Sequence, residues 1–171
     1  TKKPVICSTA GCSTKEIDNL VSFYMHLEIP FAIMHCVALY PTQGPDLQLN
    51  KIDILKERYP FLPVGFSTHE KPDNLVAVQI AFAKGAQLFE RHVGIETDKI
   101  KLNAYSSTPA QIDQWLKSML QAKEFCGSKT VQKPKQEEID SLTSLRRGCY
   151  AKEDIRKGEI ILPERVFFAM P

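Results

Sequence analysis

Short apolar runs alternate with amphipathic segments four times over residues 1–126. The apolar runs span 5–8, 31–37, 63–67 and 87–92, and each precedes a segment with apolar residues at helical spacing. Strict alternation of strands and helices predicts a parallel sheet with right-handed crossovers. Such a sheet is either an open doubly wound sheet or part of a (β/α)8 barrel. A complete barrel takes about 250 residues, so four units amount to half of one.

The expected helices have recognisable ends. Ser13 and Glu16 have the form of a capping box, and the helix that follows carries apolar residues up to Tyr24. Further helices are predicted within 46–58 and over 73–84, the latter ended by a left-handed Gly85. Thr108 and Pro109 have the pattern of an N-cap followed by an N1 proline, which predicts a last helix through Ala122.

The composition changes after residue 126. The first part of residues 127–144 contains several Lys and Gln residues and a Pro and shows no periodicity, so we predict a linker. Residues 145–171 contain two short apolar runs around an Asp-x-x-x-Gly turn, which favours the beginning of a small β-rich domain. The predicted domains are therefore 1–126, the linker 127–144, and 145–171.

Charge and hydropathy narrow the function classes. The formal net charge is only +2 and there is no long basic run, which gives no electrostatic support for nucleic-acid binding. No stretch approaches the roughly 18–20 apolar residues of a membrane helix. Five scattered cysteines are typical of free thiols in a reducing compartment. We therefore expect a cytoplasmic protein without nucleic-acid or membrane partners.

Polar side chains follow the predicted strands at the edge where ligands bind in parallel α/β folds. His69 and His92 follow the third and fourth strands, which lie about 5 Å apart as neighbours. Two imidazoles with water and substrate oxygens suit a divalent cation, whereas hydrogen bonds to the backbone are the alternative. The hydroxyls of Ser8 and Ser67 at the same edge suit a phosphate or carboxylate.

Two further observations concern charged or metal-binding side chains. His35 is the one obvious third ligand for a zinc hydrolase on a similar barrel, but its place inside an apolar strand favours a structural hydrogen bond. Glu90 and Arg91 alternate across the last strand, so one of them is expected to face the barrel interior and to need a partner there.

At the strand ends the chain resembles the sialic acid synthase family. The family's motifs are an Ile-Ser-Thr-Gly type turn, His-Cys-x-x-x-Tyr-Pro-Thr, Gly-Leu-Ser-Asp-His and Glu-Lys/Arg-His-Phe. The corresponding segments here, in the same order, are Cys7–Gly11, His35–Thr42, Gly65–His69 and Glu90–Val93. Residues 146–159 are similar to the start of the family's antifreeze-like (SAF) domain. The resemblance therefore covers essentially the whole chain.

The resemblance implies the last four β/α units of a TIM barrel, followed by a linker and a SAF domain. It implies a transferase that condenses phosphoenolpyruvate with an N-acyl amino sugar, with Mn²⁺ as cofactor and Mg²⁺ or Co²⁺ as alternatives. His69 and His92 would bind the metal, Ser8 and Ser67 the phosphate of phosphoenolpyruvate, and Tyr40, with Asn103, the sugar. It also implies a domain-swapped homodimer, and no catalytic residue is assigned in this half.

Ala38 stands where the family often has Asn or Ser, and three further positions depart from the family pattern. Thr68 replaces an Asp, and Asn103 stands where the family has an acid. Met170 stands where the family carries an arginine that reaches the partner subunit's active site. Because of these departures, the alternative is that the protein is a degenerate, non-catalytic relative that serves binding or assembly. Because the family's catalytic glutamate and phosphate-binding lysines come from the other half, we expect the 171-residue chain alone to be inactive.

Overall fold

The structure is a computed structural model that describes residues 3–170. The chain divides into two compact units at the bond between Gly127 and Ser128. The first unit contains all four predicted strand–helix pairs, and the second contains a helix and a small hairpin.

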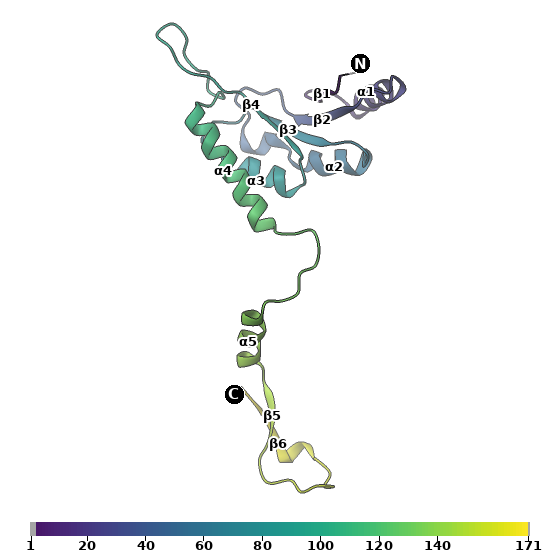
Figure 1. The fold of residues 1–171 in the computed structure, drawn as a ribbon, viewed down its shortest axis with the longest axis vertical. Coiled ribbons are helices and arrows are strands. Elements are labelled where there is room, and N and C mark those ends of the chain that lie inside the picture. Colours follow the sequence, from purple (N-terminus) through teal and green to yellow (C-terminus); the bar gives the residue numbers. More distant parts are fainter. Residues whose placement is uncertain (1–2, 171) are drawn as a thin grey trace. The chain divides into compact units, whose positions relative to one another are not determined.

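Four parallel strands form the sheet of the first unit: β1 (Val5–Ser8), β2 (Phe31–Cys36), β3 (Val64–Thr68) and β4 (Leu88–Arg91). Their order in the sheet is their order in the chain (Figure 1). The register pairs Ser8 with Met34, and Cys36 with Ser67. A doubly wound sheet reverses its strand order at a switch point, whereas a barrel adds strands in sequence. The order therefore favours the barrel.

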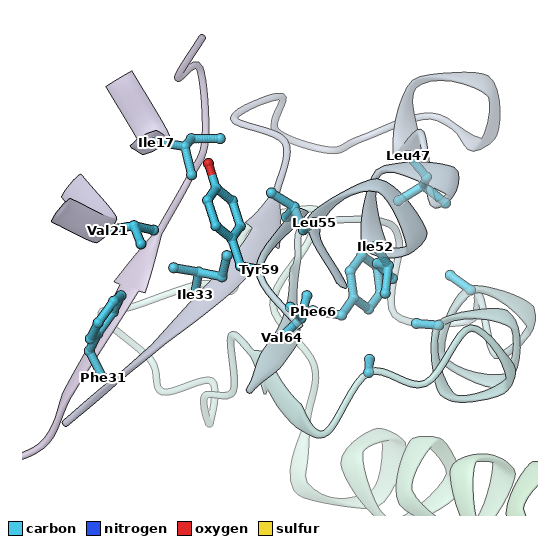
Figure 2. Packing of buried hydrophobic residues seen from close by; sticks show 13 residues of the cluster. Ile17, Val21, Phe31, Ile33, Leu47, Ile52, Leu55, Tyr59, Val64 and Phe66 are labelled. Atoms are coloured by element: carbon cyan, nitrogen blue, oxygen red, sulfur yellow. The ribbon is translucent and has the colours of Figure 1, made fainter. Parts of the chain in front are cut away.

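A single apolar cluster joins the sheet to its helices, α1 (Thr14–His26), α2 (Asn50–Arg58) and α3 (Val76–Ala83). Its members are Ile17, Val21, Phe31, Ile33, Leu47, Ile52, Leu55, Tyr59, Val64, Phe66, Ala77, Ala81 and Ala86. Figure 2 shows these side chains between the strands and the helices, and labels ten of them. Because one cluster includes residues from all three helices, these helices cover the same face of the sheet. The fold is thus a curled parallel half-barrel, as predicted.

Several helix ends form as the sequence predicts. Ser13 and Glu16 form the reciprocal capping box of α1. Thr108 and Gln111 form a second capping box at the start of α4 (Pro109–Cys126), which packs beside α3. Gly85 follows α3 with a φ of +84°, the left-handed conformation that glycine adopts without a steric penalty.

The helix predicted within 46–58 is confirmed as α2, and a 3-10 turn (η1, Gly44–Leu47) precedes it. Gln48, whose φ is +46°, and Leu49 separate the two. The helix predicted over 73–84 begins only at Val76, because the side-chain oxygen of Asn74 accepts the N–H groups of Val76 and Ala77. No helix among residues 3–170 has both the length and the apolar character needed to cross a membrane.

The second unit contains α5 (Gln136–Leu145), a 3-10 turn (η2, Pro163–Arg165), and the antiparallel pair β5 (Gly148–Ala151) and β6 (Val166–Ala169). Helix α5 lies mostly inside the predicted linker 127–144, so only residues 127–135 of that segment lack a helix or strand. The helix carries Ile139, Leu142 and Leu145 at three-residue spacing and acidic residues in its first turn. The helix was predicted as part of the linker because its short apolar pattern directly follows a Pro- and Lys-containing segment without periodicity.

Candidate metal centre

The two histidines of the predicted site lie together. His69 directly follows β3 and His92 directly follows β4, and these strands are neighbours in the sheet. Their ring centroids are 5.1 Å apart, with the ring planes inclined at 51°. The side chain of His69 is buried and that of His92 is exposed. The pair therefore combines a ring held within the protein with one that is open to solvent.

A backbone contact fixes the tautomer of His69. Its Nδ1 lies 3.0 Å from the carbonyl oxygen of Val37, and the thiol of Cys36 lies 3.9 Å from the same nitrogen. Because a carbonyl oxygen only accepts, Nδ1 carries the proton and donates it to Val37. Nε2 then has a free lone pair, the form in which a neutral imidazole binds a cation. Backbone bonding and metal binding are thus compatible at this residue, since they use different nitrogens.

The histidine pair does not form a complete metal site by itself. Among residues 3–170, no group of three or more His, Cys, Asp or Glu side chains is arranged to hold a metal ion. Two imidazoles with room for oxygen ligands suit a catalytic cation whose remaining positions are taken by water and substrate. The donors present fit a cation of that kind.

Two tyrosines lie against the histidines. The ring of Tyr40, in the loop after β2, lies 4.4 Å from that of His69. Tyr105 lies 5.9 Å from His69 and 5.1 Å from His92, nearly perpendicular to both rings at 88° and 89°. The two tyrosines are themselves 5.1 Å apart. Tyr40 was predicted for this site, whereas Tyr105 was missed because it lies in an irregular loop without periodicity.

Asn103, the other predicted sugar contact, has a role in that loop. Its side-chain oxygen accepts the backbone N–H of Tyr105 at 3.2 Å, and its carbonyl oxygen accepts the N–H of Ser106. The loop is held to the strand end by Ser107, whose N–H donates to the carbonyl oxygen of His92 at 2.9 Å. Asn103 therefore shapes the turn that presents Tyr105 to the histidines.

The two predicted phosphate ligands lie at the same edge of the sheet but on strands separated by β2. Ser8 ends β1 and is exposed, and its hydroxyl accepts the N–H of Ala10 at 3.4 Å. Ser67 is buried in β3, two residues before His69 and hence on the same face. Their backbones are separated by two strand spacings and by a further two residues along the strand, which together amount to about 12 Å. The two hydroxyls therefore do not contact each other.

A buried ion pair lies beside the histidines. Nη1 of Arg91 donates to Oε1 of Glu70 at 2.8 Å, and each side chain is only 1% exposed. Burial raises the pKa of Glu70, an effect that the positive charge of Arg91 opposes. Arg91 also lies over the ring of Trp115 in α4, so it faces the helices. Arg91 is thus the member of the pair that is buried with a partner. Glu90 lies opposite Ser67 in the register, on the other face of the sheet, and is exposed.

Thr68 replaces the aspartate of the family motif and is almost completely buried. Its hydroxyl makes no hydrogen bond among the described residues. In the sheet register Thr68 lies opposite Arg91, and the carboxylate that pairs with this arginine is supplied two residues later, by Glu70. Arg91 therefore has a carboxylate partner, Glu70, although position 68 does not supply one.

His35 is separate from the histidine pair. Its Nε2 donates to the carbonyl oxygen of Leu47 at 2.7 Å, and its ring stacks on Phe66 of the apolar cluster. Burial lowers the pKa of this imidazole. His35 thus makes the structural hydrogen bond expected from the sequence, and it does not supply the third ligand that a zinc hydrolase would need.

A parallel sheet whose strands follow one another in chain order, with two histidines at the carboxyl ends of neighbouring strands, places the chain in the class of (β/α)8-barrel proteins. The sequence profile of the NeuB family matches residues 1–131. The chain belongs to this family, which is the sialic acid synthase family recognised in the strand-end motifs.

The chain is also similar to solved structures and to curated proteins. A protein described as spore coat polysaccharide biosynthesis protein E from Chromobacterium violaceum is 40% identical, with a TM-score of 0.87 over 100% of this chain and 51% of that one. An N-acetylneuraminic acid synthetase from Leptospira borgpetersenii is 29% identical, with a TM-score of 0.70 over 84% and 50%. The pseudaminic acid synthase of Campylobacter jejuni is 28% identical over 99% of this chain and 49% of its own length. The chain spans about half the length of the curated relatives it matches.

Proposed function

We propose that the full-length protein condenses phosphoenolpyruvate with an N-acyl amino sugar, giving a sialic-type acid and inorganic phosphate. The observation that carries the proposal is the pairing of His69 and His92, with ring centroids 5.1 Å apart at the ligand-binding edge of the half-barrel. Membership of the NeuB family and similarity to a pseudaminic acid synthase support it.

The residues of this chain would hold the reactants. His69, through Nε2, and His92 would bind the divalent cation, Mn²⁺ in the first instance, with Mg²⁺ or Co²⁺ as alternatives. The cation would supply Lewis-acid polarisation of the sugar aldehyde. Ser8 and Ser67 would donate hydroxyl hydrogen bonds to the phosphate of phosphoenolpyruvate. Tyr40 would lie against the sugar, with Asn103 setting the turn beside it.

The proposed reaction balances without an oxidant or reductant. C3 of phosphoenolpyruvate forms a bond to the aldehyde carbon, and the aldehyde oxygen takes up a proton. Water adds to C2 and loses a proton, giving a tetrahedral intermediate. The bond between C2 and the phosphate oxygen then breaks as the C2 hydroxyl loses its proton, which leaves a 2-keto acid and inorganic phosphate. We propose that the groups that move these protons lie outside residues 1–171.

The alternative is a non-catalytic relative that serves binding or assembly. The role of Asn103 favours it, since an amide engaged in a turn cannot act as a base. Met170, in the second unit, likewise offers no charge where the family has an arginine. This alternative predicts cation or sugar binding without phosphate release.

We further propose that residues 145–171 begin a SAF domain and that the full-length protein is a domain-swapped homodimer. The antiparallel pairing of β5 with β6 is consistent with the small β-rich domain expected there. A SAF domain that completes the partner's site would need a sugar contact other than Met170.

The test is a phosphate-release assay on the full-length protein with phosphoenolpyruvate, Mn²⁺ and a panel of N-acyl hexosamines and their 6-phosphates. We expect sugar-dependent release that EDTA abolishes and that His69→Ala and His92→Ala each reduce to background. His26→Ala is the matched control, because His26 is exposed at the end of α1. Wild-type activity in both site variants would contradict the proposed centre. Absence of release with every sugar would favour the non-catalytic alternative.

A further inference from the structure

Each histidine of the candidate centre has one member of the buried ion pair as its neighbour in the chain. Glu70 follows His69, and Arg91 precedes His92. Their side chains meet at 2.8 Å and are 1% exposed. The ion pair therefore joins the two backbone segments that carry the imidazoles.

Arg91 makes more than one bond across this junction. Besides Oε1 of Glu70, its Nη2 donates to the carbonyl oxygens of Glu70 at 3.0 Å and of Lys71 at 2.8 Å. Its Nε donates to the hydroxyl of Ser107 at 2.8 Å, and the N–H of Ser107 donates to the carbonyl oxygen of His92. One guanidinium thus holds the segment after β3 and the loop that carries Tyr105.

The sheet itself does not fix the distance between the histidines. The register of β3 with β4 ends at the pair Thr68 and Arg91, one residue before each histidine. Beyond that pair, the segments are joined by the side chain of Arg91 rather than by ladder hydrogen bonds. In this chain position 68 is a threonine and supplies no carboxylate, and the planar guanidinium of Arg91 bonds several groups at once. The lysine that the family motif also allows here would offer a single ammonium and could not reproduce this fixed fork of donors.

We propose that the ion pair of Glu70 and Arg91 is a positioning device for the two-histidine centre, setting the separation and orientation of its imidazoles. The inference rests on the cation site of the proposed function. Neither side chain contacts the cation or the substrate, so both are positioning residues. Supporting groups outside the ligand shell typically change metal affinity by about 10- to 100-fold.

The test is a titration of the full-length protein with Co²⁺. The visible absorption of the bound ion is recorded during the titration and reports both the affinity and the coordination geometry. Arg91→Lys keeps the charge but loses the fork of donors, so we expect about tenfold weaker binding and an altered spectrum. Glu70→Gln replaces a charged hydrogen bond with a neutral one and should also weaken binding. It provides the same test if Arg91→Lys does not fold. Near-ultraviolet circular dichroism identifies the folded variants.

Arg58→Lys is the matched control, since Arg58 makes a two-bond pair with Asp18 away from the histidines. It should bind Co²⁺ as the wild type does. Wild-type affinity and spectrum in a folded Arg91→Lys or Glu70→Gln protein would overturn the inference. If His69→Ala loses Co²⁺ binding in the same experiment, the cation site of the proposed function still holds. A wild-type protein that binds no Co²⁺ through His69 would overturn both.

Discussion

One hydrogen bond determines which nitrogen of the His69 imidazole can bind a cation. Donation from Nδ1 to the carbonyl of Val37 leaves Nε2 as the nitrogen that can bind a cation. The position of His69 at a strand end followed from the apolar run before it, but its tautomer did not. That property depends on a backbone oxygen 32 residues earlier in the chain, which the fold brings beside the ring.

The same distinction applies to Tyr105 and Glu70. Tyr105 reaches the histidines because Asn103 and Ser107 shape its loop, and no periodic pattern in the sequence indicates such a contact. Glu70 directly follows His69, and its pairing with Arg91 depends on the register of β3 and β4. Strand-end position was thus predictable, whereas contacts between loops were not.

His35 predicts a pH dependence of stability. Burial lowers its pKa in the folded protein, so below the ordinary value of about 6.5 the unfolded state binds the proton more readily. The contribution of neutral His35 is therefore complete above about pH 6.5 and is lost as the pH falls. Relative to His35→Gln, the free energy of unfolding of the wild type should decline between about pH 7 and 5. Urea denaturation measures both, and parallel pH profiles would contradict the prediction.

At the scale of elements, the periodicity of the sequence located every strand and helix of the half-barrel, because each buries one side in a shared core. Boundaries were less predictable. Gln48 has a left-handed conformation between η1 and α2, and the side chain of Asn74 caps the start of α3. Neither feature can be predicted from the pattern of apolar residues.

Helices α1 and α2 are tied by Asp18, which accepts hydrogen bonds from Arg58 and from the hydroxyl of Tyr59. These bonds lower the pKa of Asp18 from 3.8 to about 2. Because the folded pKa is depressed, the contribution is present above the ordinary pKa and is lost as the pH falls towards the folded value. Asp18→Asn should therefore be less stable than the wild type at neutral pH. The difference in urea midpoint should shrink between pH 4 and 2, and a constant difference would contradict the assignment.

Gly65 tests the close approach of β3 to its neighbours. A Cβ atom there would overlap the sulfur of Met34 and lie 2.8 Å from Leu88. Gly65→Ala should destabilise the protein by about 1–3 kcal/mol, as overpacked cores do. Gly44→Ala is the matched control, since its Cβ would meet nothing within 4 Å. Equal unfolding midpoints for the two variants in thermal denaturation would show that the sheet has room at Gly65.

At the scale of the whole molecule, β1 and β4 form the two edges of the four-stranded sheet. The fold class and the half-barrel were predictable because unit length and strand–helix order limit the possible architectures. The second unit was predicted less well, because α5 carries a short apolar pattern next to a segment without one.

Open edges predict association of the 171-residue polypeptide when it is produced by itself. Ile6 of β1 is 61% exposed, and unpaired strand edges favour pairing with other chains. We expect concentration-dependent dimers or larger species in sedimentation velocity, and a shift to a defined complex on addition of the polypeptide that completes the barrel. A monodisperse monomer that unfolds cooperatively would contradict this expectation.

The most direct measurement of the central claim is calorimetric titration of the full-length protein with Mn²⁺, comparing the wild type with His69→Ala, His92→Ala and His26→Ala. Joint binding by the two histidines predicts one cation per chain in the wild type and in His26→Ala, and loss of that binding in each of the other two variants. Unchanged Mn²⁺ affinity in His69→Ala and His92→Ala would contradict the two-histidine centre.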